Sequence, residues 1–146
     1  MRKINYIVVH CSATREGCTL TSEVLEAEHR RRGFRTTGYH YYIRRDGTVL
    51  GTRSLELPGA HCRGHNKYSI GICYEGGLDA WGNPKDTRTP EQRSALHLLV
   101  YQLLQQFRNA RVCGHRDLSP DLDGDGTVEP WEWVKQCPCF EVSKEF

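Results

Sequence analysis

INYIVVH, at residues 4–10, is a run of mostly β-branched and aromatic residues that ends in a histidine. Side chains alternate between the two faces of a strand, so Tyr6, Val8 and His10 share one face and the residues between them share the other. Both faces are largely apolar, as in a strand covered on both sides. The stretch therefore predicts a mostly buried strand that presents His10 at its end.

Two helices carry clear start and stop signals. The first is expected to begin at a cap on Thr21 or Ser22 and to end where Gly33 follows a basic turn. The second opens at Thr89 and Pro90, a capping residue followed by a proline at the first helical position. Its apolar stripe consists of Leu96, Leu99, Val100, Leu103, Leu104 and Phe107.

The remaining elements are short. The dipeptide Asp46-Gly47 tolerates positive φ and predicts a tight hairpin turn. The other expected elements are hairpin strands at 39–43 and 48–53, strands at 69–74 and 111–113, and a last short helix that begins near Pro130 and includes 131–134. With no internal repeat and no linker, this order predicts an α/β fold, one domain over residues 1–146 with a central mixed sheet flanked by helices.

The composition excludes several classes of protein. With 38% hydrophobic and 26% charged residues, the 146-residue chain is typical of a soluble globular protein. Its 20 basic and 18 acidic side chains are too evenly balanced for nucleic-acid binding. The apolar run near the N-terminus is too short for a signal peptide or a membrane span, and the seven cysteines are expected to be reduced. We therefore expect synthesis in the cytoplasm and no nucleic-acid partner.

Three residues that can bind a soft metal lie at the ends of expected elements. They are His10, His115 after the short strand, and Cys137 before Pro138. Two histidines and a thiolate would form a zinc site with a fourth position open to water, which is the arrangement of catalytic sites. From the pattern alone, a histidine at a strand end is more often a hydrogen-bonded structural residue than a metal ligand, and a cysteine such as Cys137 is commonly a small buried apolar residue.

Four local motifs occur in a characteristic order along the chain. They are IVVHCSAT at 7–14, GYHY at 38–41 followed by RDG at 45–47, His61 with Asn66 and SIG at 69–71, and KQCP at 135–138. This series resembles the zinc-dependent N-acetylmuramoyl-L-alanine amidases, the family of amidase-type phage lysozymes and peptidoglycan-recognition proteins. The resemblance extends from Ile4 to about Phe140. It implies the amidase and peptidoglycan-recognition-protein fold.

The resemblance also implies roles for individual residues. His10, His115 and Cys137 match the zinc ligands, Tyr39 and Lys135 match the polar catalytic pair beside the metal, and His61 matches a histidine on the side of the substrate groove. The implied substrate is peptidoglycan, cut at the amide between N-acetylmuramic acid and the L-alanine of the stem peptide. We expect a monomer, made without a signal peptide, that acts on the cell wall after release.

Several alternatives stay open at this stage. Without the resemblance, Tyr39 is a hairpin core residue and Lys135 a surface lysine. Cys139 competes with Cys137 for the metal, although the Lys-x-Cys-Pro pattern favours Cys137. The basic residues Arg44, Arg45, Arg63 and Lys67 can meet stem-peptide carboxylates or be ordinary solvated charges. A non-catalytic peptidoglycan-binding module of the same fold is the alternative function, and fold alone does not separate the two.

The segment DLDGDGTVEPWE at 121–132 fits the calcium-loop pattern D-x-D-x-D-G-x5-E at every specified position. The expected calcium ligands are Asp121, Asp123, Asp125, Thr127, Glu129 and Glu132. A solvent-exposed acidic turn is the alternative. Because the insertion lies between His115 and Cys137, calcium is expected to raise both stability and activity by fixing the approach to the zinc site.

Overall fold

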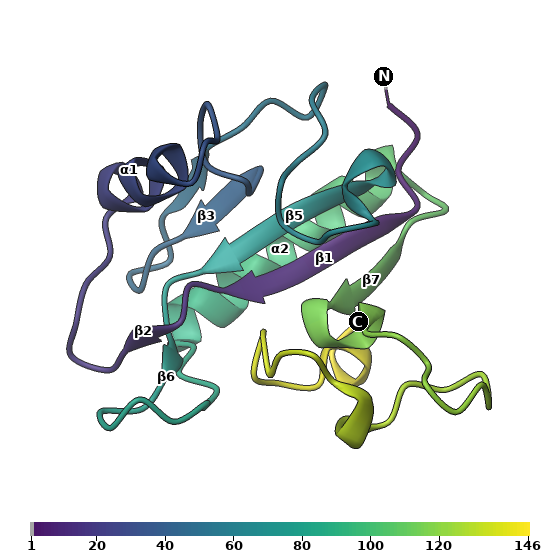
Figure 1. Ribbon diagram of the computed structural model, residues 1–146. Helices are drawn as coiled ribbons and strands as arrows, with labels where there is room; N and C mark the ends of the chain where they lie inside the picture. The colour runs from purple at the N-terminus through teal and green to yellow at the C-terminus, as the bar shows by residue number, and fades with distance from the viewer. Residues whose placement is uncertain (1) are drawn as a thin grey trace.

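The computed structural model describes residues 2–146 and centres on a five-stranded sheet with the order β4-β3-β5-β1-β7 (Figure 1). Its strands are β1 Tyr6–Cys11, β3 Tyr41–Ile43, β4 Val49–Gly51, β5 Ser69–Tyr74 and β7 Arg111–Gly114. Strands β3, β5, β1 and β7 are parallel, and β4 pairs antiparallel with β3. The sheet is mixed, as predicted. Because β1 and β7 are parallel, their C-terminal ends lie at the same edge of the sheet.

Two faces of the sheet have different roles. Ile7, Val9 and Ile72 lie on the face packed against helix α2, Pro90–Gln106, which runs behind the sheet in Figure 1. The helix contributes Leu96, Leu99, Val100 and Leu103 to this buried cluster. Burying one such side chain stabilises the fold by about 1.5–3 kcal/mol. The opposite face therefore remains for the functional side chains.

The helix signals act as expected. Helix α1, Ser22–Arg31, has Thr21 as its N-cap, and the Thr21 side chain accepts a hydrogen bond from the Val24 amide at 3.2 Å. Gly33 follows the helix with φ 94°, a conformation that favours glycine. In α2, Thr89 and Gln92 form a reciprocal capping box. Both starts predicted from the sequence are confirmed.

Three short elements differ from the prediction. The last helix is a single 3-10 turn, Pro130–Glu132, because Trp133 is already extended with φ −65° and ψ 123°, so the predicted helix over 131–134 is wrong beyond Glu132. A small parallel pair, β2 Thr14–Arg15 with β6 Gly77–Leu78, was not predicted. Two-residue strands are too short to show a period. Further 3-10 turns are Asn66–Tyr68, His115–Leu118 and Val142–Lys144.

No helix within residues 2–146 combines the length and the apolarity that a membrane crossing needs.

His40 makes stability depend on pH. It is fully buried, its Nδ1 accepts from the Gly71 amide at 3.1 Å, and its Nε2 donates to the Leu57 carbonyl at 2.8 Å. Burial lowers the pKa of His40 to about 4, so below the unfolded value of about 6.5 the unfolded chain binds a proton that the folded chain does not. The free energy of unfolding therefore falls as pH falls between these values, by up to about 1.4 kcal/mol per pH unit.

Chemical unfolding at pH 7 and pH 5 checks this prediction. The loss of stability between the two pH values should be roughly 2 kcal/mol smaller in His40→Gln than in the wild type. Equal losses in the two proteins would contradict the assignment of a neutral buried His40.

Candidate active site

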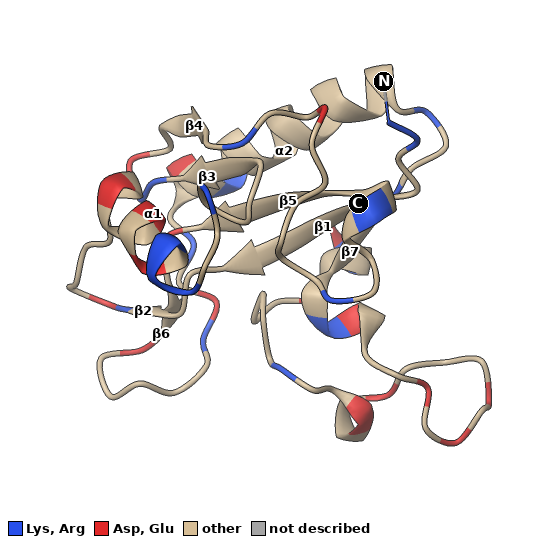
Figure 2. Ribbon diagram, turned by 45° about the horizontal axis from the view of Figure 1, so that its top comes forward, with Lys and Arg blue, Asp and Glu red and all other residues tan. Residues whose placement is uncertain are grey.

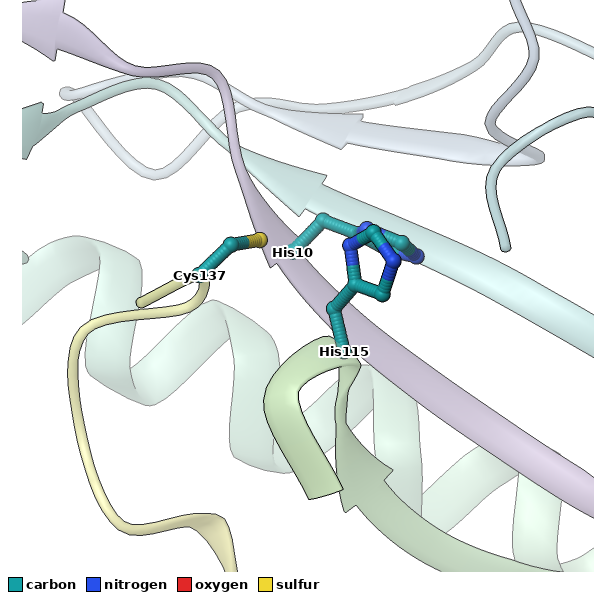
Figure 3. A group of neighbouring side chains, drawn as sticks. All are labelled: His10, His115 and Cys137. Atoms are coloured by element: carbon teal, nitrogen blue, oxygen red, sulfur yellow. The ribbon is translucent and has the colours of Figure 1, made fainter. Parts of the chain in front are cut away.

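Three side chains from distant parts of the sequence meet where β1 and β7 end. Val9 pairs with Gly114 in the sheet, which places His115 beside His10, and their ring centroids are 4.6 Å apart. Cys137 approaches from the C-terminal segment (Figure 3). One nitrogen of each histidine and the Cys137 sulfur all lie within 4.8 Å of one another. The structure thus brings together the three predicted metal ligands.

Strand β1, which carries His10, and the 3-10 turn that begins at His115 both hold the Cys137 segment in place. The Cys11 amide donates to Cys137 Sγ at 3.1 Å, and the Arg116 amide donates to the Cys137 carbonyl at 2.9 Å. Tyr74 Oη donates to the carbonyl of Pro138 at 2.6 Å. At Gly114 a Cβ would lie 2.6 Å from the Pro138 ring, so only glycine lets the two segments approach this closely.

The donor set fits a zinc ion. Zn²⁺ prefers imidazole nitrogen and thiolate sulfur, and tetrahedral bonds of about 2.0–2.3 Å place ligand atoms roughly 3.3–3.8 Å apart, a spacing that small side-chain movements within this cluster allow. Burial holds the pKa of His10 well below its usual range, and positive charge on His61, His115 and Lys135 would lower it further. His10 is therefore neutral, the form that binds metal.

Cys139 lies outside this cluster. Its Sγ is 3.9 Å from the Cys11 Sγ and donates to the Gly77 carbonyl at 3.4 Å. Its backbone has φ 71°, unusual for a residue with a side chain. The geometry thus places Cys137 with the two histidines, and Cys139 beside Cys11.

The expected catalytic pair flanks the cluster. The Tyr39 ring lies 5.0 Å from the His10 ring, and burial raises the pKa of Tyr39 well above its usual value, with negative charge on Cys73 and Cys137 adding to the effect. The phenol stays protonated and can donate a hydrogen bond. Lys135 is exposed and lines a groove together with His115.

This groove has a volume of about 870 Å³. Residues that line it include Arg32, Phe34, Arg63, His65, His115 and Lys135. Arg32 and Phe34 follow α1 and were not predicted as groove residues, because the basic turn was interpreted from the sequence only as a signal for the end of the helix. Nothing in the arginine run distinguishes Arg32 from its neighbours; only the fold turns it towards the groove.

The four basic residues named from the sequence separate in the structure. Arg63 lines the groove. Arg44 instead pairs with the buried Glu75 at 2.9 Å, and Arg45 donates to the carbonyls of Arg15 and Cys18. The Lys67 ammonium lies 5.4 Å from the centroid of the Tyr68 ring, and Lys67 is not among the groove-lining residues.

His61 is buried against the sheet and is one of the residues that line the groove. Its Nδ1 lies 2.8 Å from His10 Nε2, and its Nε2 lies 3.0 Å from Ser69 Oγ. From the sequence, Ser69 was named only as part of the SIG motif, with no role of its own. Both ring nitrogens of His61 thus have partners within the protein.

The acidic loop 121–132 extends away from the sheet and from α1 (Figure 2). Its acids form two overlapping groups, Asp121 with Asp123 and Glu132, and Asp123 with Asp125 and Glu129, with one oxygen from each acid lying within 4.8 Å of the others in its group. Glu132 is buried and accepts from the Leu122 and Glu129 amides. The neighbouring carboxyl groups of Asp125 and Glu132 raise the pKa of Glu129 to about 8. Thr127 is exposed, and its amide donates to Asp125 at 2.9 Å.

Comparisons with known proteins agree with this geometry. The sequence pattern of the N-acetylmuramoyl-L-alanine amidase family matches residues 1–138. The chain is 35% identical over 143 residues to an endolysin of Klebsiella phage KP32, with 98% of this chain and 85% of the endolysin covered. It is similar in structure to the amidase LysC from Clostridium intestinale URNW, with a TM-score of 0.75, 26% identity, and 99% of this chain and 82% of LysC covered.

A more distant structure shares only the fold. This is PGRP-SA from Apis mellifera, with a TM-score of 0.73, 21% identity, and 99% of this chain and 82% of that chain covered. The family match extends over most of the sequence, including all three residues of the His10, His115 and Cys137 cluster. The chain therefore belongs to the N-acetylmuramoyl-L-alanine amidase family.

Proposed function

We propose that the protein is a zinc-dependent hydrolase that cuts the amide bond between N-acetylmuramic acid and the L-alanine of the peptidoglycan stem peptide. The observation that carries this proposal is the convergence of His10, His115 and Cys137 beside a groove lined by Lys135. The family match and the endolysin relative support peptidoglycan as the substrate. A monomer made in the cytoplasm and acting on the wall after release is part of the proposal.

The reaction adds water across the amide bond, giving the lactyl carboxylic acid and the free amine of L-alanine. Zn²⁺ held by the three ligands would polarise the carbonyl and lower the pKa of water towards about 7. Tyr39, which stays protonated, donates a hydrogen bond to the oxygen that becomes negative. Lys135 neutralises this charge from the groove side, and either group can pass a proton to the leaving amine.

The alternative is a binding module that holds peptidoglycan without cutting it. The complete ligand set favours the enzyme, because a protein that only binds has no need for a cysteine among the ligands. Two measurements distinguish the enzyme from the binding module: the metal content of the protein, and the release of new amino termini from purified peptidoglycan. We expect one zinc per chain and zinc-dependent release, whereas retention on peptidoglycan with no release would establish the binding module.

We also propose that the 121–132 loop binds calcium. Its support is the complete sequence pattern, the two overlapping groups of carboxylates, and Glu129 Oε2, a buried oxygen without a hydrogen-bond partner among residues 2–146. Mutual repulsion of these carboxylates would be relieved by a divalent cation. Lys135 and Cys137 follow the loop directly, so a fixed Glu132 would also steady their approach to the zinc site.

Calcium titration of the zinc-loaded protein tests this site. At 100-fold excess over Kd, calcium should add about 2.7 kcal/mol of stability, a rise in Tm of roughly 5–10 °C, and should raise activity. Asp121→Asn/Asp125→Asn should lose the response, whereas Asp79→Asn, at a separate turn, should keep it. If calcium changes neither the Tm nor the activity of the wild type, the proposal is wrong and the loop is an acidic turn.

A further inference from the structure

His61 connects the candidate zinc site to strand β5, because it lies between His10 and Ser69. It is 9% exposed, its Nδ1 meets His10 Nε2 at 2.8 Å, and its Nε2 meets Ser69 Oγ at 3.0 Å. A neutral imidazole offers one donor and one acceptor. Both are used within the protein, so His61 has no ring nitrogen left for a substrate.

The fold makes room for this ring. Ser69, Gly71 and Cys73 share one face of β5, and Cys73 pairs with His10 of β1. A Cβ at Gly71 would lie 2.6 Å from His61 Cγ, and one at Gly59 would lie 2.5 Å from His61 Cδ2. The imidazole therefore fills space that two glycines leave open between His10 and Ser69.

The backbone at His61 is held in place as well. Asn66 Oδ1 accepts hydrogen bonds from the amides of His61 and Cys62, both at 2.9 Å. Ser69 itself is fully buried as the first residue of β5. The position of the His61 ring is thus fixed by the hydrogen bonds to its backbone, by its packing against Gly59 and Gly71, and by the partners of both ring nitrogens.

The chain of hydrogen bonds can run in either of two directions. If Ser69 donates to His61 and His61 donates to His10, then His10 Nε2 accepts and the proton of a neutral His10 sits on Nδ1. If His10 Nε2 donates to His61 and His61 donates to Ser69, then His10 Nδ1 has a free lone pair. Only the second direction leaves His10 able to bind a metal through the nitrogen that His61 does not occupy.

We propose that His61 is a positioning residue, which with Ser69 fixes the tautomer and orientation of His10 as a metal ligand and does not bind the substrate. The inference rests on the proposed zinc site. Partners of this kind orient metal ligands in other proteins, and their loss typically lowers metal affinity or activity by about 10- to 100-fold.

Three variants test this role. His61→Gln removes the ring, Ser69→Ala removes only the far end of the chain of hydrogen bonds, and His97→Gln is a matched control because His97 is exposed on α2. Zn²⁺ affinity is measured by competition with a chelator, and the visible absorption spectrum of the Co²⁺-loaded protein reports ligand geometry. Steady-state kinetics on soluble muropeptides separates kcat from KM.

We expect zinc affinity about 10- to 100-fold weaker in His61→Gln, a smaller loss in Ser69→Ala, and an altered Co²⁺ spectrum in both. At saturating zinc, kcat should fall while KM stays close to the wild-type value. His97→Gln should match the wild type throughout. Should His61→Gln fail to fold, Ser69→Ala alone decides, since it removes one hydroxyl.

Two results would overturn the inference in distinguishable ways. Wild-type zinc affinity and Co²⁺ spectra in both variants, with a raised KM in His61→Gln, would make His61 a substrate-binding residue and leave the proposed function intact. A wild type that binds no stoichiometric zinc would overturn the proposed function and this inference with it.

Discussion

Cys137→Ser should lose stoichiometric zinc and lower kcat by about 10³-fold or more, because the thiolate is the only sulfur ligand in the cluster and the proposed chemistry depends on the metal. The segment is otherwise held through backbone groups, the Cys137 carbonyl by Arg116 and the Pro138 carbonyl by Tyr74. The fold should therefore survive the substitution. Metal analysis by mass spectrometry and kinetics on purified peptidoglycan measure the two losses.

Cys139→Ser is the matched control for this variant. Cys139 lies two residues away and its sulfur contacts Cys11 and Gly77 rather than the histidines. The Cys139→Ser variant should keep one zinc per chain and an activity close to that of the wild type. The opposite pattern, with zinc lost in Cys139→Ser and kept in Cys137→Ser, would move the ligand role to Cys139.

Tyr39→Phe should lower kcat by about 10²- to 10³-fold and leave KM within about two-fold, as expected when a single donor to a developing oxyanion is removed. The zinc content should not change, because Tyr39 is not among the three ligands. Since the pKa of Tyr39 is raised well above its usual value, its ionisation should not limit activity at or below pH 10.

The control for Tyr39→Phe is Tyr101→Phe, an exposed tyrosine on α2. It makes the same chemical change outside the site and should have no effect on kcat. An unchanged kcat with a raised KM in Tyr39→Phe would assign the hydroxyl to ground-state binding of the substrate. It would then leave Lys135 as the only group of the pair that acts on the transition state.

Local signals predicted most of the fold. Thr21 and Thr89 cap the helices because their side chains accept amide hydrogen bonds that the helix itself cannot satisfy. The alternation in residues 4–10 predicted which face carries His10. The sequence did not predict β2 and β6, since two-residue strands form only when the longer elements bring their backbones together.

The site was predicted in part, and mainly through a family resemblance. His10 and His115 stand at strand ends, which spacing can indicate, but the approach of Cys137 depends on Gly114 and Pro138 packing together. His61 was expected on the side of the substrate groove, and it is among the groove-lining residues. Its contact with Ser69 depends on the space left at Gly71, and no periodic pattern reports that space.

Identification of the bond that is cut is the most direct test of the proposed function. Purified muropeptides incubated with the zinc-loaded protein should yield stem peptides that begin with L-alanine and sugars that carry a free lactyl carboxyl group, both identified by liquid chromatography and mass spectrometry. We expect these products and no new reducing sugar ends. New reducing ends, or new amino termini at any residue other than L-alanine, would contradict the proposed function.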